Sequence, residues 1–179
     1  GRGGGQGTQS FRLLTVADGK TATIEGAAPA FSPDGSSLAY VTRSANENRL
    51  MVTPVTDAAN AAVVRSGPER IDAPAFAPDG QRLAFQIMPK EDWEIHIVGR
   101  DGKSESRLTR EIQHDLMPRF VGNDRLIGMI GEARHRRSHL YDLATGNRTR
   151  IFHNNTVRTI APEYAWVPSP DGQKILIVA

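Results

Sequence analysis

Short apolar runs separated by turn-forming residues dominate the hydrophobic pattern of this chain. The runs are rich in Val, Ile, Leu, Phe and Tyr, and groups of Gly, Pro, Asp and Asn lie between them. No stretch has a helical period of useful length; the nearest, residues 57–64, is short and rich in alanine. Short apolar runs bounded by turn residues are typical of strands, so the pattern predicts an all-β chain.

One segment recurs and organises these strands into a repeat. Phe31, the turn Pro33-Asp34-Gly35 and the apolar run 38–41 return as Phe76, the turn Pro78-Asp79-Gly80 and the run 83–86. The period is about 45 residues, which is the length of four short strands with their connections in one blade of a β-propeller.

Two further copies of the segment are less regular. The third has Phe120 before the turn Gly122-Asn123-Asp124, and the fourth has Trp166 before Pro170-Asp171-Gly172, with two extra residues ahead of its turn. Proline fixes φ at the first corner of a tight turn, aspartate bonds to nearby backbone, and glycine supplies a positive φ. Each copy therefore predicts a hairpin.

A second, looser strand pair follows in each period, for example at 94–98 and 106–109. We therefore predict about four blade-equivalents of antiparallel strands. The expected divisions are a flexible leader (1–10) and a propeller segment (11–179) made of the last two strands of a blade (11–27), three blades (28–71, 72–114 and 115–160) and the first two strands of another (161–179).

The motif Phe-Ser-Pro-Asp-Gly, together with the intervening segment 95–102 and Arg107-Leu108-Thr109, resembles the WD40-like PD40 repeat of the TolB type. The resemblance implies a toroid whose inner strands, near residues 29–31, line a central channel. It implies a ring of about six to eight blades. This chain is therefore expected to be an arc of a larger propeller, the alternative being that its N-terminal strand pair completes the C-terminal one and closes an unusually small four-blade ring. It also implies a periplasmic or extracellular location.

The same resemblance implies a non-catalytic module that binds a protein or a peptide. The alternative is a substrate-gating propeller domain of a larger secreted peptidase, of the prolyl-oligopeptidase, tricorn or zinc-aminopeptidase type. In that case a covalently linked hydrolase domain lies outside this chain. A small-molecule or carbohydrate binder would need aromatic residues in the loops, and these are few.

No catalytic constellation is apparent in the sequence. There is no Gly-x-Ser-x-Gly elbow and no cysteine, and the histidines have no serine and acid at informative spacing. His135 and His139 have the spacing of helical zinc ligands, but Arg136 stands where the zinc-peptidase motif needs glutamate. We therefore expect no metal and no cofactor, and whether the full-length protein is an enzyme stays open.

Charge adds one local feature. The 22 basic and 20 acidic residues give a net charge of only +2, too weak a field to predict binding to nucleic acid or to a membrane surface, and no apolar stretch is long enough for membrane insertion. Between Gly131 and Ile160, however, arginines outnumber acidic residues. Arginine forks suit carboxylate and phosphate groups, so an acidic peptide or a C-terminal carboxylate is a candidate ligand, while a solvated blade rim is the simpler explanation of the same charges. The candidate binding residues are Arg134, His135, Arg136, Arg137 and His139.

The remaining positions that recur in the repeat are expected to have structural roles. Asp34, Asp79 and Asp171 lie in separate units, so they are expected to hold turns rather than calcium, which needs six to eight clustered oxygens. The repeated aromatics are expected to pack between neighbouring blades. These aromatics are Phe31, Phe76, Phe120 and Trp166.

Overall fold

The computed structural model describes residues 9–110, 112–131, 136–151 and 165–178, and these contain strands and turns but no helix. The prediction of an all-β chain is therefore confirmed. All strand pairs are antiparallel.

The strands form three four-stranded sheets flanked by two strand pairs. The first pair is β1 (Ser10–Leu14) and β2 (Thr21–Glu25). The first sheet is β3 (Ala27–Phe31), β4 (Ser37–Arg43), β5 (Asn48–Pro54) and β6 (Ala62–Gly67). The second is β7 (Arg70–Phe76), β8 (Arg82–Met88), β9 (Glu94–Gly99) and β10 (Ser106–Arg107). The third is β11 (Asp115–Phe120), β12 (Arg125–Ile130), β13 (Arg137–Asp142) and β14 (Arg148–Arg150), and the last pair is β15 (Ala165–Pro168) and β16 (Ile175–Val178).

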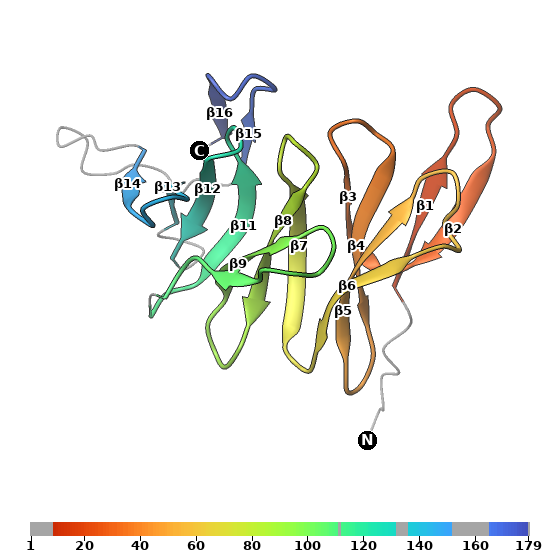
Figure 1. Cartoon of the computed structure of the whole chain (residues 1–179), viewed down its shortest axis with the longest axis horizontal. Coiled ribbons are helices and arrows are strands. Elements are labelled where there is room, and N and C mark those ends of the chain that lie inside the picture. The colour runs from red at the N-terminus through yellow and green to blue at the C-terminus, as the bar shows by residue number, and fades with distance from the viewer. Residues whose placement is uncertain (1–8, 111, 132–135, 152–164, 179) are drawn as a thin grey trace.

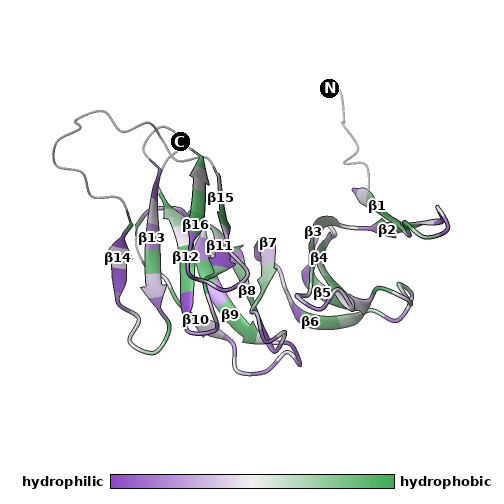
Figure 2. Ribbon diagram, turned by 90° about the horizontal axis from the view of Figure 1, so that it is seen from above, coloured by the Kyte–Doolittle hydropathy of each residue, from purple (hydrophilic) through white to green (hydrophobic). Residues whose placement is uncertain are grey.

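The sheets stand side by side along an arc (Figure 1). Seen from above, the first strands of the sheets, β3, β7 and β11, lie toward its inner side, and later strands lie further out (Figure 2). Because each sheet continues from its inner strand outward in chain order, the arrangement is that of propeller blades. The chain thus forms a partial propeller, as the repeat predicts.

Apolar layers between successive sheets form the core. The β3–β6 and β7–β10 sheets share a cluster that includes Leu50, Ile71 and Phe85. The β7–β10 and β11–β14 sheets share one that includes Ile95, Phe120 and Leu126. Burying such side chains contributes roughly 1.5–3 kcal/mol each, so the stacking of sheets is the main stabilising contribution.

Smaller clusters join the flanking strand pairs to the sheets. Ile24 of β2 packs with Tyr40 and Met51 of the β3–β6 sheet, and Trp166 of β15 packs with Ile127 and Met129 of the β11–β14 sheet. Every layer therefore has apolar side chains from both of its sheets.

The tight turns are closed by the hydrogen bonds that their sequence predicts. The Ser32 amide donates to the Ser37 carbonyl at 2.9 Å, and the Ala77 amide to the Arg82 carbonyl at 2.9 Å. The third turn is one residue shorter, since the Val121 amide donates to the Arg125 carbonyl at 2.9 Å. Deletion of one turn residue is thus absorbed within the loop and leaves the strands paired.

Two of the repeated aromatics differ from expectation. Phe76 and Phe120 are buried, at 8% and 7% exposed, whereas Phe31 is 56% exposed. The prediction that Phe31 packs between blades is therefore wrong. Its neighbour is the β1–β2 pair, whose two strands cover Tyr40 and Met51 but leave Phe31 outside the cluster.

Trp166 is buried, at 5% exposed, but it is not the counterpart of Phe31. Pro168 lies opposite Ile175, as Phe31 lies opposite Leu38, so Trp166 stands two residues further from the turn. A shift of two residues keeps a side chain on the same face of a strand, which explains why Trp166 still packs inward.

Each inner strand of the three full sheets contains a bulge before a proline. The pairing shifts register between Ala27 and Ala30, between Asp72 and Ala75, and between Leu116 and Arg119. Ala28, Ala73 and Met117, the residues before these prolines, have φ of 51°, 47° and 52°. The left-handed region is unfavourable for residues with a Cβ, so the repeat retains strain at one level of the inner wall.

Candidate ligand-binding rim

Loops of all three full sheets meet at the end of the molecule away from the Pro-Asp-Gly turns. We call this end the rim; it comprises the connections β4–β5, β6–β7 and β8–β9, the described residues 108–110 and 112–114 between β10 and β11, and Gly131 and Arg136 next to β12 and β13, toward the lower side of Figure 1. The rim carries both a pocket and the described residues of the predicted arginine cluster.

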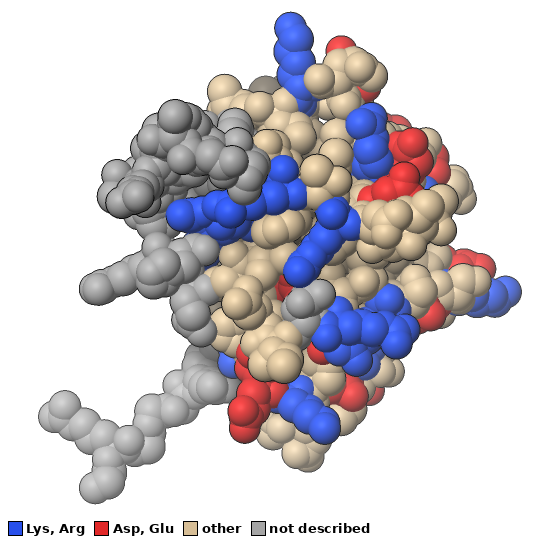
Figure 3. Space-filling model, turned by 90° about the vertical axis from the view of Figure 1, so that its left-hand side faces the viewer, with Lys and Arg blue, Asp and Glu red and all other residues tan. Residues whose placement is uncertain are grey.

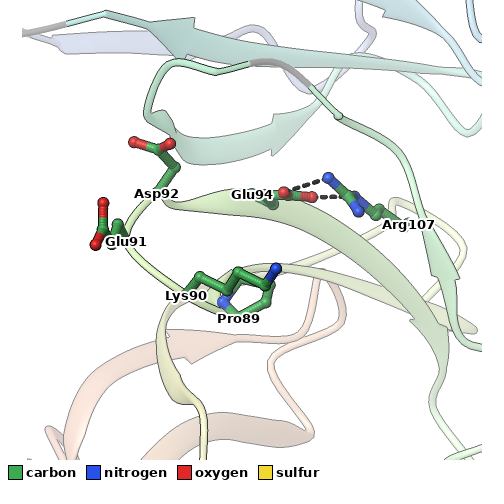
Figure 4. Close-up of a pocket in the computed structure, with 6 residues that line it drawn as sticks. All are labelled: Pro89, Lys90, Glu91, Asp92, Glu94 and Arg107. Carbon is green, nitrogen blue, oxygen red and sulfur yellow. Dashed lines mark hydrogen bonds and ion pairs between the residues drawn. The ribbon is translucent and has the colours of Figure 1, made fainter.

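The pocket has a volume of about 500 Å³ and lies between the β8–β9 connection and β10. Most of its lining residues are charged, and Glu94 and Arg107 contact each other at one side of it (Figure 4). The remaining lining residues are Pro89, Lys90, Glu91 and Asp92.

An ion pair between the buried Glu94 and the exposed Arg107 organises this pocket. Glu94 is 7% exposed and both of its carboxylate oxygens face the Arg107 guanidinium. The Arg107 Nε also donates to the Thr109 carbonyl at 2.8 Å, while the Thr109 hydroxyl accepts from the Ile95 amide at 2.9 Å. Removing Arg107 would leave the buried Glu94 charge uncompensated, and the pair holds the end of β10 against β9.

Asp92, another lining residue, lies beside a histidine. The Asp92 carboxylate lies 3.5 Å from the His114 imidazole, and the Trp93 amide donates to His114 Nδ1 at 3.2 Å. The Arg70 guanidinium stacks 5.4 Å from the centre of the Trp93 ring.

Three of the five predicted binding residues lie within the described part of the chain. Arg136 precedes β13, and Arg137 and His139 are in it; Arg134 and His135 lie outside the described residues. The Arg137 Nη1 donates to the Arg136 carbonyl at 2.6 Å. His139 is paired with Arg150 of β14, so the structure gathers further basic residues beside those predicted.

Arg110, Arg136 and Arg150 have no acidic partner among the described residues, and Arg110 and Arg150 are exposed. The Arg136 Nε is buried and has no hydrogen-bond partner there. Arginines of the first full sheet are paired instead: Arg43, Arg49 and Arg65 lie 2.9, 2.5 and 2.8 Å from carboxylate oxygens. Among the described residues, Arg110, Arg136 and Arg150 thus form an unpaired group beside the β11–β14 sheet, while Arg12, Arg70, Lys90 and Arg100 elsewhere on the arc also have no acidic partner.

The surface view agrees with this distribution. Figure 3 shows basic side chains across the middle of the face at the β13–β14 end of the arc, while most acidic ones lie toward its margins. An arginine offers five donors in a rigid fork, so a group of them suits carboxylate ligands.

Behind this face lies a buried polar group. The Tyr141 hydroxyl donates to Asp115 Oδ1 at 3.2 Å, and Asp115 is fully buried. Burial, followed by the charge of Asp115, raises the pKa of Tyr141. The tyrosine therefore stays protonated and serves as a donor that ties β13 to β11.

The turn aspartates bond within their own loops. Asp34 Oδ1 accepts from the Ser32 hydroxyl at 2.5 Å and its Oδ2 from the Ser36 hydroxyl at 2.7 Å. Asp79 accepts from the Gln81 amide at 2.9 Å, and Asp171 from the Ser169 hydroxyl at 2.5 Å. Among the described residues, no three His, Asp or Glu side chains gather as metal ligands. Within the same residues, none forms a helix that could span a membrane.

Sequence reasoning missed the Glu94–Arg107 pair and Arg110. Glu94 opens a strand that reads as an ordinary apolar run, and only the fold brings Arg107 to it. The sequence did contain one indication of the pair, because Glu94 is a charged residue in a strand whose other side chains are mostly apolar.

Comparison with known proteins identifies relatives of the fold. The family model PD40, described as the TolB beta propeller domain, matches residues 13–179. No curated protein matches the chain.

Several solved structures are similar to this chain. TolB from Acinetobacter baumannii has a TM-score of 0.78 and 19% identity over 95% of this chain. A putative TolB from Agrobacterium tumefaciens has a TM-score of 0.67 and 20% identity, again over 95%. A puromycin-hydrolysing peptidase from Mycobacterium tuberculosis has a TM-score of 0.59 and 22% identity over 83%. This chain spans 43%, 70% and 24% of those three proteins.

Proposed function

Because the chain belongs to the TolB beta propeller domain family, we propose that it is a non-catalytic module that binds an acidic protein or peptide segment on its rim. The observation that carries the proposal is the group of arginines without acidic partners, Arg110, Arg136 and Arg150, beside the β11–β14 sheet. A periplasmic or extracellular location belongs to the same proposal.

The energetics favour a ligand with several carboxylates. One exposed ion pair contributes about 0.2–1 kcal/mol, too little to hold a peptide alone. Several pairs formed together, with the partly buried Arg136 among them, contribute enough for a weak, salt-sensitive complex. A peptide carrying consecutive aspartates and glutamates matches this requirement.

The proposal is tested by fluorescence anisotropy with a short labelled peptide of Asp and Glu, compared with its Asn and Gln isostere. Combined Arg136→Ala and Arg150→Ala substitutions are expected to weaken binding about tenfold, the equivalent of roughly 1.4 kcal/mol. Arg12→Ala is the matched control, because Arg12 is an exposed arginine of β1 at the other end of the arc. The proposal would be contradicted if the Arg12→Ala control lost as much affinity as the Arg136→Ala and Arg150→Ala variant, or if the Asn and Gln isostere bound as tightly as the acidic peptide.

The second candidate function is that of a substrate-gating domain joined to a peptidase. Its support is that the same fold occurs in the Mycobacterium tuberculosis peptidase, of which this chain spans 24%. Peptidase assays of the full-length gene product separate the two: hydrolysis of peptides by that product would favour the gating function, and binding without hydrolysis the non-catalytic one.

A further inference from the structure

One cation stands apart from the rim, on the inner wall of the arc. Arg119 lies on β11, opposite Ile127 of β12. The same register position is occupied by Ala30 in β3, Ala75 in β7 and Val167 in β15. The repeat therefore places one arginine at a level where its other inner strands have small or apolar side chains.

Arg119 is partly buried without charge compensation. Its Nη1 donates to the carbonyl of Pro118 at 2.8 Å, and no described acidic residue pairs with it. The two acids on the described inner strands are engaged elsewhere, Asp72 with Arg43 at 2.9 Å and Asp115 with Tyr141. Burial lowers the pKa of Arg119, but a guanidinium does not lose its proton in a protein. The partly desolvated guanidinium therefore favours an anion as its partner.

A second unsatisfied donor lies in the same layer. Trp166 is 5% exposed, and its indole Nε1 is buried with no hydrogen-bond partner among the described residues. It packs in one cluster with Ile127, the cross-strand partner of Arg119, and with Met117, two residues before Arg119. An indole N–H can only donate, so this donor also requires an acceptor.

We propose that Arg119 and the Trp166 indole N–H together bind one carboxylate of a peptide at the inner wall between β11 and β15. This site rests on the proposed function and adds to it a position for one specific carboxylate, distinct from the rim. A carboxylate has two oxygens, so one accepts from the guanidinium and the other from the indole. Bonds from charged donors are the stronger kind, which makes Arg119 the principal contact.

The chain has two tryptophans, so its indole N–H signals report the site directly in a ¹H–¹⁵N spectrum. A Trp93→Phe variant assigns them. Three peptides are titrated at constant ionic strength: N-acetyl-alanyl-alanine, which has a C-terminal carboxylate; N-acetyl-aspartyl-alanine amide, which has a side-chain carboxylate; and N-acetyl-alanyl-alanine amide, which has neither. We expect saturable movement of the Trp166 signal with a carboxylate peptide and none with the neutral amide.

Arg119→Ala gives β11 the residue that β3 and β7 already have at this level, so the fold is expected to persist. Affinity measured at the Trp166 signal should fall at least tenfold, while Arg12→Ala should leave it unchanged. Arg119→Gln is the second variant, because it keeps the length of the side chain without its charge and should show the same loss.

Binding of N-acetyl-alanyl-alanine would show that the site takes the C-terminal carboxylate of a peptide. Binding of N-acetyl-aspartyl-alanine amide would show that it takes an acidic side chain. A Trp166 signal that does not move, that moves equally with the neutral amide, or that responds unchanged in Arg119→Ala and Arg119→Gln would overturn the site. If the rim still binds the acidic peptide in that case, only the inner site fails; if neither binds, the proposed function fails as well.

Discussion

At the scale of single residues, the Pro-Asp-Gly turns show how a repeated motif acts. Hydrogen bonds from the Ser32 hydroxyl, and next from the Ser36 hydroxyl, lower the pKa of Asp34 to about 2. A carboxylate with a lowered pKa contributes stability above its unfolded value of 3.8 and loses that contribution as pH falls through about 2. The turn is therefore fully supported at neutral pH.

Substitution of Ser32 tests this account of the turn. Ser32→Ala removes the largest cause of the shift, so the pKa of Asp34 should rise from about 2 toward 3.8 in a carbon-13 titration of the carboxyl group. Ser36→Ala should raise it less, since the Ser32 hydroxyl, the largest cause of the lowered pKa, still donates to Asp34 Oδ1. An unchanged pKa in Ser32→Ala would show that the hydroxyl does not hold the carboxylate.

Residue roles were predictable where one motif determines them. The turn aspartates and the inward Phe76 and Phe120 follow from the local repeat, because a tight turn fixes which neighbours face the core. Exposure of Phe31 depends on how many strands stand beside it, and the isolation of Arg119 depends on acids elsewhere in the chain. Neither property can be predicted from a short segment of sequence. An alignment of the repeats within the chain would, however, have placed Arg119 at the position of Ala30 and Ala75.

At the scale of strands and sheets, the bulges of the inner strands are the recurring irregularity. A positive φ costs a residue with a Cβ roughly 1–2 kcal/mol, and glycine avoids that cost at an entropic penalty of roughly 0.5–1 kcal/mol. Ala28→Gly is therefore expected to stabilise the chain by about 0.5–1 kcal/mol in urea unfolding. Ala30→Gly, two residues along the same strand in ordinary pairing, is the control and should destabilise by about 0.5–1 kcal/mol.

Equal destabilisation by both glycines would show that the bulge at Ala28 is not strained. The bulges were not predicted from the sequence. The prolines do indicate them, because Pro29, Pro74 and Pro118 each lie within an inner strand and proline cannot donate a hydrogen bond to the neighbouring strand.

Packing between sheets is tested by a matched pair of phenylalanines. Phe76 is buried against the β3–β6 sheet, so Phe76→Ala should cost about 3–4 kcal/mol of unfolding free energy. Phe31 precedes an equivalent turn but is 56% exposed, so Phe31→Ala should cost about 1 kcal/mol or less. Similar losses from the two substitutions would mean that Phe31 is covered in solution.

At the scale of the whole molecule, uneven charge matters more than net charge. The total of +2 hides a first full sheet whose arginines are paired and a β11–β14 sheet with arginines that are not. Local composition predicted this asymmetry, but not its extension to Arg110, which reaches the rim through the β10–β11 connection.

Salt dependence follows from this distribution. Exposed ion pairs are screened as the Debye length falls from about 10 Å at 0.1 M salt to about 3 Å at 1 M. Binding of the acidic peptide should weaken about tenfold or more over this range, and Arg136→Ala with Arg150→Ala should flatten the dependence. Affinity that is independent of salt would assign the binding to apolar contacts instead.

Mapping the peptide onto the chain tests the central claim most directly. In a ¹H–¹⁵N titration of the labelled protein with the Asp and Glu peptide, the largest shifts should fall on Arg110, Arg136 and Arg150, at the rim beside the β11–β14 sheet. Shifts confined to the opposite end, at the turns that contain Asp34 and Asp79, or no saturable shifts at all, would contradict it.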